Sequence, residues 1–202
     1  MAMLDRFYPI VPDIQWLERL LPWGVKLVQL RIKDRESAAV RDQIRRGMEA
    51  AARWDCQLIV NDYWREAIDL GADFIHLGQE DLDQADLAAI RRAGLKIGVS
   101  THDEAELERG LSLDPEYVAL GPIYETTLKK MRWAPQGLPR LGQWRKRVAC
   151  PLVAIGGITL ERAAGVFAAG ADSVAVVTDI VRQADPQTRT EHWLRQSRTW
   201  SR

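Results

Sequence analysis

Two aspartates, Asp62 and Asp81, follow two short apolar segments of the chain, 57–60 and 73–77. Residues 63–70 between them have the spacing of a short helix, so the unit is expected to run strand, helix, strand. In such a unit both strands end on the same side of a parallel sheet, which would bring the two carboxylates together. Paired carboxylates suit Mg²⁺, which fills its other positions with water and phosphate oxygens. The alternative is that each aspartate caps the helix that follows it.

Cationic side chains follow an earlier apolar segment, 25–30. Alternation along the strand places Gln29, Arg31 and Lys33 on one side of the chain. Two cations and an amide at one strand end could hold a polyphosphate, with Arg binding through its fork and Lys as a mobile point charge. The alternative is a solvated run of surface charges that pair with one another.

Three later strand ends carry groups that suit an anion. Ser100 could donate to a phosphate, and Thr101 after it could cap the next helix. The long segment 121–130 is rich in hydroxyls and lysines, and long loops in compact domains are usually functional. Gly156 and Gly157 would let backbone amides approach a phosphate at a place where barrels often build such a site.

The elements that must position these groups alternate regularly. Apolar strand segments are expected at 6–10, 25–30, 57–60, 73–77, 95–99, 116–120, 151–155 and 172–177, with helices such as 37–54, 83–92 and 103–111 between them. Eight strands, each followed by a helix, in 202 residues predict a single-domain (β/α)₈ TIM barrel, an α/β fold, over residues 1–202. A doubly wound open sheet is the second possibility.

The composition limits the partners of the chain. Lys plus Arg and Asp plus Glu each number 28, so the net charge is zero and no nucleic-acid or membrane surface is expected. Cys56 and Cys150 lack the spacing of metal ligands, and we expect both to be reduced and structural. The first residues show no apolar leader and no segment reaches transmembrane length, so a cytoplasmic location is expected.

Several of these segments together resemble the thiamine phosphate synthase family. The resemblance rests on VQLRIKD at 28–34, VNDYW at 60–64, HLGQEDL at 76–82, IGVSTH at 97–102, the TxxK segment 126–129, VAIGGIT at 153–159 and GADSVAVVT at 170–178. It implies a (β/α)₈ barrel that joins a hydroxymethylpyrimidine diphosphate to a thiazole phosphate and releases pyrophosphate. The implied reaction is dissociative: pyrophosphate leaves first, and the thiazole nitrogen then captures a pyrimidine methylene cation.

The same resemblance implies a role for particular residues of this chain. It implies that the pyrimidine diphosphate is held by Gln29, Arg31, Lys33, Asn61, Ser100 and Lys129, with Arg31, Lys33 and Lys129 acting in catalysis. Asp62 and Asp81 would bind Mg²⁺. The thiazole phosphate would be held by Thr126, Thr127, Leu128, Gly156, Gly157, Val177 and Thr178. Leu128 stands where many relatives carry a hydroxyl residue, and Thr178 stands in place of the usual Ser.

Two other functions are weighed against this one. The related thiazole tautomerases use a histidine acid/base at about the position of Pro122, and proline cannot do that work. A non-catalytic module that binds thiamine phosphate would be expected to lack Lys129 or one of the metal carboxylates, Asp62 and Asp81. The chain has all three of these residues. The expected partners are therefore two small-molecule substrates, together with a possible second copy in a homodimer.

Overall fold

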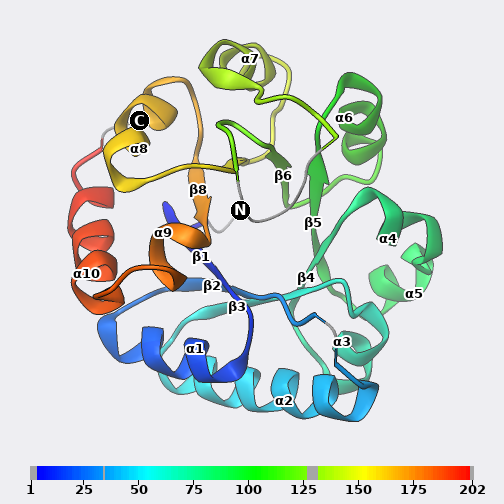
Figure 1. Ribbon diagram of the computed structural model, residues 1–202. Helices are drawn as coiled ribbons and strands as arrows, with labels where there is room; N and C mark the ends of the chain where they lie inside the picture. Colours follow the sequence, from blue (N-terminus) through cyan, green and yellow to red (C-terminus); the bar gives the residue numbers. More distant parts are fainter. Residues whose placement is uncertain (1–3, 34, 127–131, 201–202) are drawn as a thin grey trace.

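The computed structural model describes residues 4–33, 35–126 and 132–200. Eight parallel strands close into a barrel in the order in which they occur in the chain, and helices surround it (Figure 1). The strands are β1 Phe7–Val11, β2 Leu27–Leu30, β3 Gln57–Asn61, β4 Phe74–Leu77, β5 Lys96–Thr101, β6 Tyr117–Leu120, β7 Leu152–Ile155 and β8 Ser173–Val176. β1 pairs with β8 through Phe7 and Val174, which closes the barrel. The predicted TIM barrel is confirmed and the open sheet is excluded.

At least one helix follows each of the eight strands, and the helices cover the outside of the barrel. They are α1 Ile14–Leu20, the short 3₁₀ helix η1 Leu21–Trp23, α2 Ser37–Arg53, α3 Trp64–Leu70, α4 Gln79–Gln84, α5 Leu87–Arg92, α6 Glu104–Leu111, α7 Gly137–Arg145, α8 Leu160–Ala168, α9 Thr178–Val181 and α10 Pro186–Ser197. None of the described helices is long and apolar enough to cross a membrane.

The strands are apolar on both faces because both faces are buried. One side packs under the helices in a large hydrophobic cluster that includes Leu30, Val60 and Trp144. The other side fills the barrel interior with a smaller cluster that includes Ile59 and Phe74. Strands buried on both faces give continuous rather than alternating apolar segments, which is the pattern that predicts a parallel sheet.

The segment 83–92 was expected to form one helix, and the structure divides it into α4 and α5. The Asp81 carboxylate accepts a hydrogen bond from the Gly78 amide at 3.1 Å, so α4 begins several residues earlier than expected. Asp86 then caps α5 by accepting from the Ala89 amide at 2.8 Å. The prediction that Thr101 caps the next helix is wrong. Thr101 lies in β5, and Asp103 caps α6.

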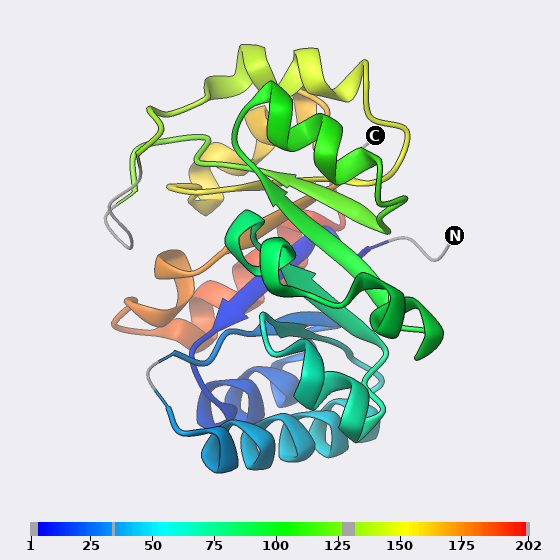
Figure 2. The same cartoon turned by 90° about the vertical axis from the view of Figure 1, so that its right-hand side faces the viewer.

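The strands all run in the same direction along the barrel. In Figure 2 their arrows point toward the loops on the left-hand side, so the carboxyl ends of the strands lie on the left and their amino ends on the right.

Both cysteines are free and half-buried, and burial raises the pKa of the Cys56 thiol to about 12. That agrees with the structural role expected for Cys56.

Candidate active site

A pocket of about 330 Å³ opens at the carboxyl ends of the strands. The structure brings twelve of the predicted site residues into its lining: Gln29, Arg31, Lys33, Asn61, Asp62, Asp81, Ser100, Thr126, Gly156, Gly157, Val177 and Thr178. Three further predicted residues, Thr127, Leu128 and Lys129, lie outside the described residues. The lining residues come from all eight strands or from the loops and first helical turns that follow them, and they meet at one mouth, as barrel geometry requires.

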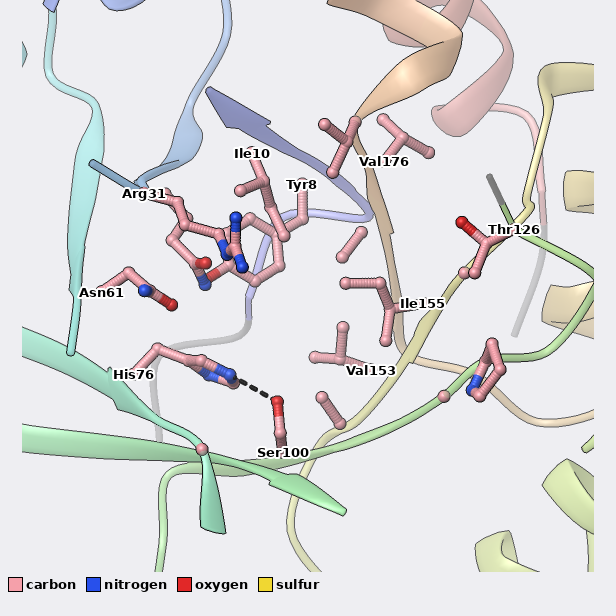
Figure 3. Close-up of a pocket in the computed structure, with 18 of the residues that line it drawn as sticks. Tyr8, Ile10, Arg31, Asn61, His76, Ser100, Thr126, Val153, Ile155 and Val176 are labelled. Atoms are coloured by element: carbon pink, nitrogen blue, oxygen red, sulfur yellow. Dashed lines mark hydrogen bonds between the residues drawn. The ribbon is translucent and has the colours of Figure 1, made fainter. Parts of the chain in front are cut away.

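The pocket has a polar wall and an apolar wall (Figure 3). On one side lie Arg31, which follows β2, and Asn61, His76 and Ser100, which come from β3, β4 and β5. Val153, Ile155 and Val176 lie across from them and come from β7 and β8, and Ile10 of β1 lies between the two groups, beside Arg31. Such a pocket can orient a flat organic ligand between the walls while its charged group contacts the polar side.

The two aspartates predicted to bind a metal lie together on the polar side. Asp62 adopts a left-handed backbone conformation with φ of 66°, and its amide donates to the His76 carbonyl at 3.0 Å. Its side chain does not cap α3. Burial, followed by the charge of Asp62 and a hydrogen bond with it, raises the pKa of Asp81 to about 6. Two carboxylates in one half-buried place repel each other unless a cation lies between them.

A lysine supplies positive charge beside these two carboxylates. Lys33 forms an ion pair with the Asp62 carboxylate, and its side chain is 45% exposed. Among the described residues no group of three or more His, Cys, Asp or Glu side chains could hold a metal ion. A site with two carboxylates still fits Mg²⁺, which binds through one or two carboxylates and otherwise uses water and substrate phosphates.

Asn61 at the end of β3 is the clearest sign that the pocket is suited to a polar ligand. Its side chain is 4% exposed and points into the pocket (Figure 3). Its Nδ2 atom is buried and has no hydrogen-bond partner within the part of the chain that the structure describes. Because an unsatisfied buried donor costs about 1–3 kcal/mol, a ligand that offers an acceptor here would recover that free energy.

A chain of hydrogen bonds that the sequence did not predict runs beneath the polar wall. Gln29 Nε2 donates to the Tyr8 hydroxyl at 2.7 Å, and that hydroxyl lies 2.9 Å from the hydroxyl of Tyr117. Tyr117 in turn lies 2.7 Å from His76 Nδ1, and His76 Nε2 lies 2.8 Å from Ser100 Oγ. The chain fixes the orientations of Gln29 and Ser100, which line the pocket.

Burial keeps this chain uncharged at neutral pH. It lowers the pKa of His76 to about 4, chiefly by desolvation, and it raises the pKa of both Tyr8 and Tyr117. A neutral imidazole between a tyrosine and a serine holds those hydroxyls in place and is a poor proton donor at pH 7. We therefore assign His76 to orientation of the polar wall.

The Gly156-Gly157 turn directly follows Ile155 on the apolar side of the pocket, and both residues need to be glycine. Their φ angles are 99° and 63°, in the left-handed region. A Cβ atom on Gly156 would lie 2.7 Å from the Cα of Pro122, and one on Gly157 would lie 2.3 Å from the Glu125 carbonyl oxygen. The turn therefore packs directly against the loop after β6 and leaves backbone open toward the pocket.

Fold and pocket together define a (β/α)₈-barrel protein whose mouth combines an acidic and cationic polar wall with a glycine turn across from it. The family model described as thiamine monophosphate synthase matches residues 7–180, which is most of the chain. The chain belongs to this family, and the resemblance noted in the sequence is confirmed.

Individual relatives agree with that assignment. The chain is 64% identical to the thiamine-phosphate synthase of Rhizobium etli over 98% of this chain and 97% of that protein. It is 48% identical to the thiamine-phosphate synthase of Klebsiella pneumoniae over 93% of this chain and 89% of the relative. A solved structure, thiamine phosphate pyrophosphorylase from Pyrococcus furiosus, superposes with a TM-score of 0.86 at 24% identity and covers 96% of both chains, which supports the fold.

Proposed function

We propose that this protein is a thiamine phosphate synthase, a transferase that joins 4-amino-2-methyl-5-hydroxymethylpyrimidine diphosphate to 4-methyl-5-(2-phosphoethyl)thiazole. The products are thiamine phosphate and pyrophosphate. The single observation that supports this most strongly is the two-walled pocket: Arg31, Lys33 and Asn61 line one side, and the Gly156-Gly157 turn lies near the apolar side. Two phosphorylated ligands can then meet between the walls.

The chemistry follows from the groups at the polar wall. The carbon–oxygen bond between the pyrimidine methylene and the diphosphate breaks, and its electron pair leaves with pyrophosphate. Arg31 and Lys33 stabilise the charge that develops on the leaving group, which is the main difficulty of the step. The thiazole nitrogen lone pair then forms the new carbon–nitrogen bond. No proton is transferred, so a neutral His76 is compatible with the reaction.

Asp62 and Asp81 fit an Mg²⁺ ion in this scheme. Burial, followed by the charge of Asp62, raises the pKa of Asp81 to about 6, so a cation between the two carboxylates is favourable. Such an ion, when bound, would neutralise charge on the diphosphate. The tautomerase alternative is disfavoured by Pro122, which lines the pocket and offers no titratable group.

The test is release of pyrophosphate from the pyrimidine diphosphate, the thiazole phosphate and Mg²⁺, with each component omitted in turn. We expect release only when all three are present, with thiamine phosphate formed in equal amount. Release without the thiazole phosphate would instead indicate a hydrolase. No release by a folded protein that binds thiamine phosphate would favour the non-catalytic binding module.

A further inference from the structure

Asp179 is a charged residue that lies directly behind the pocket. It follows Thr178, which lines the pocket, but its own side chain is only 4% exposed. The carboxylate accepts hydrogen bonds from the Leu160 amide at 3.1 Å and from Trp193 Nε1 at 2.7 Å. Arg189 donates to both of its oxygens, at 3.0 and 2.8 Å. A buried aspartate with this many donors is held in one position.

Arg189 extends the contact to a second carboxylate. Its Nη1 and Nη2 atoms donate to the two oxygens of Glu161 at 2.7 and 2.8 Å. Glu161 lies in the first turn of α8 and Arg189 lies in α10, whereas Asp179 belongs to α9. Figure 1 shows these three helices grouped on one side of the barrel. One guanidinium therefore joins all three.

The contacts meet behind the two turns that line the pocket. Leu160 is the first residue of α8 and directly follows the turn 156–159. Asp179 is the second residue of α9 and directly follows Thr178. The hydrogen bond from the Leu160 amide to Asp179 thus ties the turn after β7 to the turn after β8. In the proposed function these two turns receive the thiazole phosphate.

The positive charge of Arg189 has a second effect, which concerns the phosphate that would bind on these turns. A phosphate that sits on these turns would lie in front of the Asp179 carboxylate, and two anions close together repel strongly where water is excluded. Arg189 contacts that carboxylate through two hydrogen bonds and is itself only 17% exposed. Without Arg189, Asp179 would present an uncompensated buried negative charge to the phosphate.

We propose that Asp179 and Arg189 are positioning residues for the phosphate of the thiazole substrate. Asp179 aligns the two turns, and Arg189 holds Asp179 in place and cancels its charge. This inference rests on the proposed function and extends it to the C-terminal helix, which contributes no residue to the lining of the pocket.

The main test is the Arg189→Met variant, in which the apolar stem is retained and the charge is lost. We expect the KM for thiazole phosphate to rise about tenfold or more, because misaligned and repelled phosphate contacts lose affinity. The KM for the pyrimidine diphosphate should stay within about twofold of wild type. Adding Asp179→Asn to Arg189→Met removes the uncompensated charge, so the double variant should recover most of the lost thiazole phosphate affinity.

Arg145 provides a matched control at the other end of β8. It forms an ion pair with Asp172 at 2.5 Å, both side chains are partly buried, and Asp172 directly precedes β8, at the end of the strand away from the pocket. Arg145→Met should lower the melting temperature and leave both KM values unchanged. If Arg189→Met is too unstable to assay, Arg189→Lys replaces it, with the same selective but smaller rise in KM expected.

Three results would overturn the proposal: unchanged KM values in the Arg189 variants, an equal rise in both KM values, or a fall in kcat alone. Each would assign the network to fold stability only. Failure of the wild-type protein to form thiamine phosphate is a separate result, because it concerns the proposed function and is seen before any variant is made.

Discussion

Lys33 and Asp62 form an ion pair that joins the end of β2 to the end of β3 at the mouth of the pocket. The pair places a cation beside the carboxylates that would bind Mg²⁺. A lysine that neutralises Asp62 can turn to a diphosphate once a metal takes over that carboxylate, because its long side chain is flexible. We expect this exchange of partners to accompany substrate binding.

The Asp62→Asn variant tests the metal site. Asparagine tolerates the left-handed backbone that Asp62 adopts, so the fold should survive while the charge is lost. If Asp62 binds Mg²⁺, turnover should fall about a hundredfold, and the Mg²⁺ concentration that gives the half-maximal rate should rise. The measurement is the rate of pyrophosphate release against Mg²⁺ concentration.

Asp114→Asn is the control for that variant. Asp114 also has a positive φ, 48°, but it is exposed in the turn before β6, at the end of the barrel away from the pocket. Its replacement should leave both the rate and the Mg²⁺ requirement as in wild type. A wild-type Mg²⁺ titration in Asp62→Asn would remove Asp62 from the metal site.

Tyr8→Phe tests the buried chain of hydrogen bonds. The Tyr8 hydroxyl joins Gln29 to Tyr117, and the variant leaves both of these groups short of a partner inside the barrel. The free energy of unfolding in urea should fall by about 1–3 kcal/mol. Tyr124→Phe, a half-buried tyrosine under the Arg162 guanidinium, should change it by less than about 0.5 kcal/mol. Equal losses of unfolding free energy in the two variants would mean that the buried chain of hydrogen bonds adds no stability of its own.

Glu161 gives the fold a contribution that depends on pH. The hydrogen bond from Arg189 lowers the pKa of Glu161 to about 2 in the folded protein, below its usual value of 4.5. The unfolded chain therefore binds a proton more readily, and the stabilisation is complete above pH 4.5 and is lost as the pH falls toward 2. Solvent screens the pair, because the Glu161 side chain is 68% exposed.

Unfolding in urea at pH 7 and pH 3.5 measures this contribution. Wild type should be more stable than Glu161→Gln at pH 7, and the difference should shrink at pH 3.5. Glu191→Gln, which changes an exposed carboxylate that accepts from Gln187 in α10, should show no comparable dependence. A difference between wild type and Glu161→Gln that stays constant with pH would contradict the assigned role of the ion pair.

The barrel and most of the pocket could be predicted because they depend on local patterns. Each strand lies within about two residues of its apolar segment, and groups that follow strands in sequence meet at one end of a barrel by geometry alone. This is why Asp62, Asp81, Arg31 and Ser100 could be placed together from the sequence. The alternative that each aspartate caps a helix holds for one of the two: Asp81 accepts from the Gly78 amide at the start of α4, whereas the Asp62 side chain does not cap α3.

The buried chain was missed because its members are far apart in sequence. Tyr8 and Tyr117 are separated by 109 residues, and His76 and Tyr117 by 41. Nothing in a single sequence says which polar residues of different strands face each other inside a barrel. The one available signal was that His76 interrupts an otherwise apolar strand, where an unpartnered imidazole would be costly.

Asn61→Leu separates binding from stability most clearly. Leucine has nearly the same shape, and it removes a buried Nδ2 donor that has no partner among the described residues. The free energy of unfolding should stay the same or rise by about 1 kcal/mol. If Asn61 holds the pyrimidine diphosphate, the KM for that substrate should rise about tenfold.

Thr101→Val is the control for Asn61→Leu, because it removes a buried hydroxyl that does have a hydrogen-bond partner. Thr101 is fully buried and its hydroxyl donates to the Ala119 carbonyl at 2.9 Å, but it does not line the pocket. This variant should lose about 1 kcal/mol of stability and keep its KM. Opposite effects of the two variants on stability and KM would establish that Asn61 is kept unsatisfied for the ligand. A loss of stability in Asn61→Leu with an unchanged KM would show instead that its amide serves the fold.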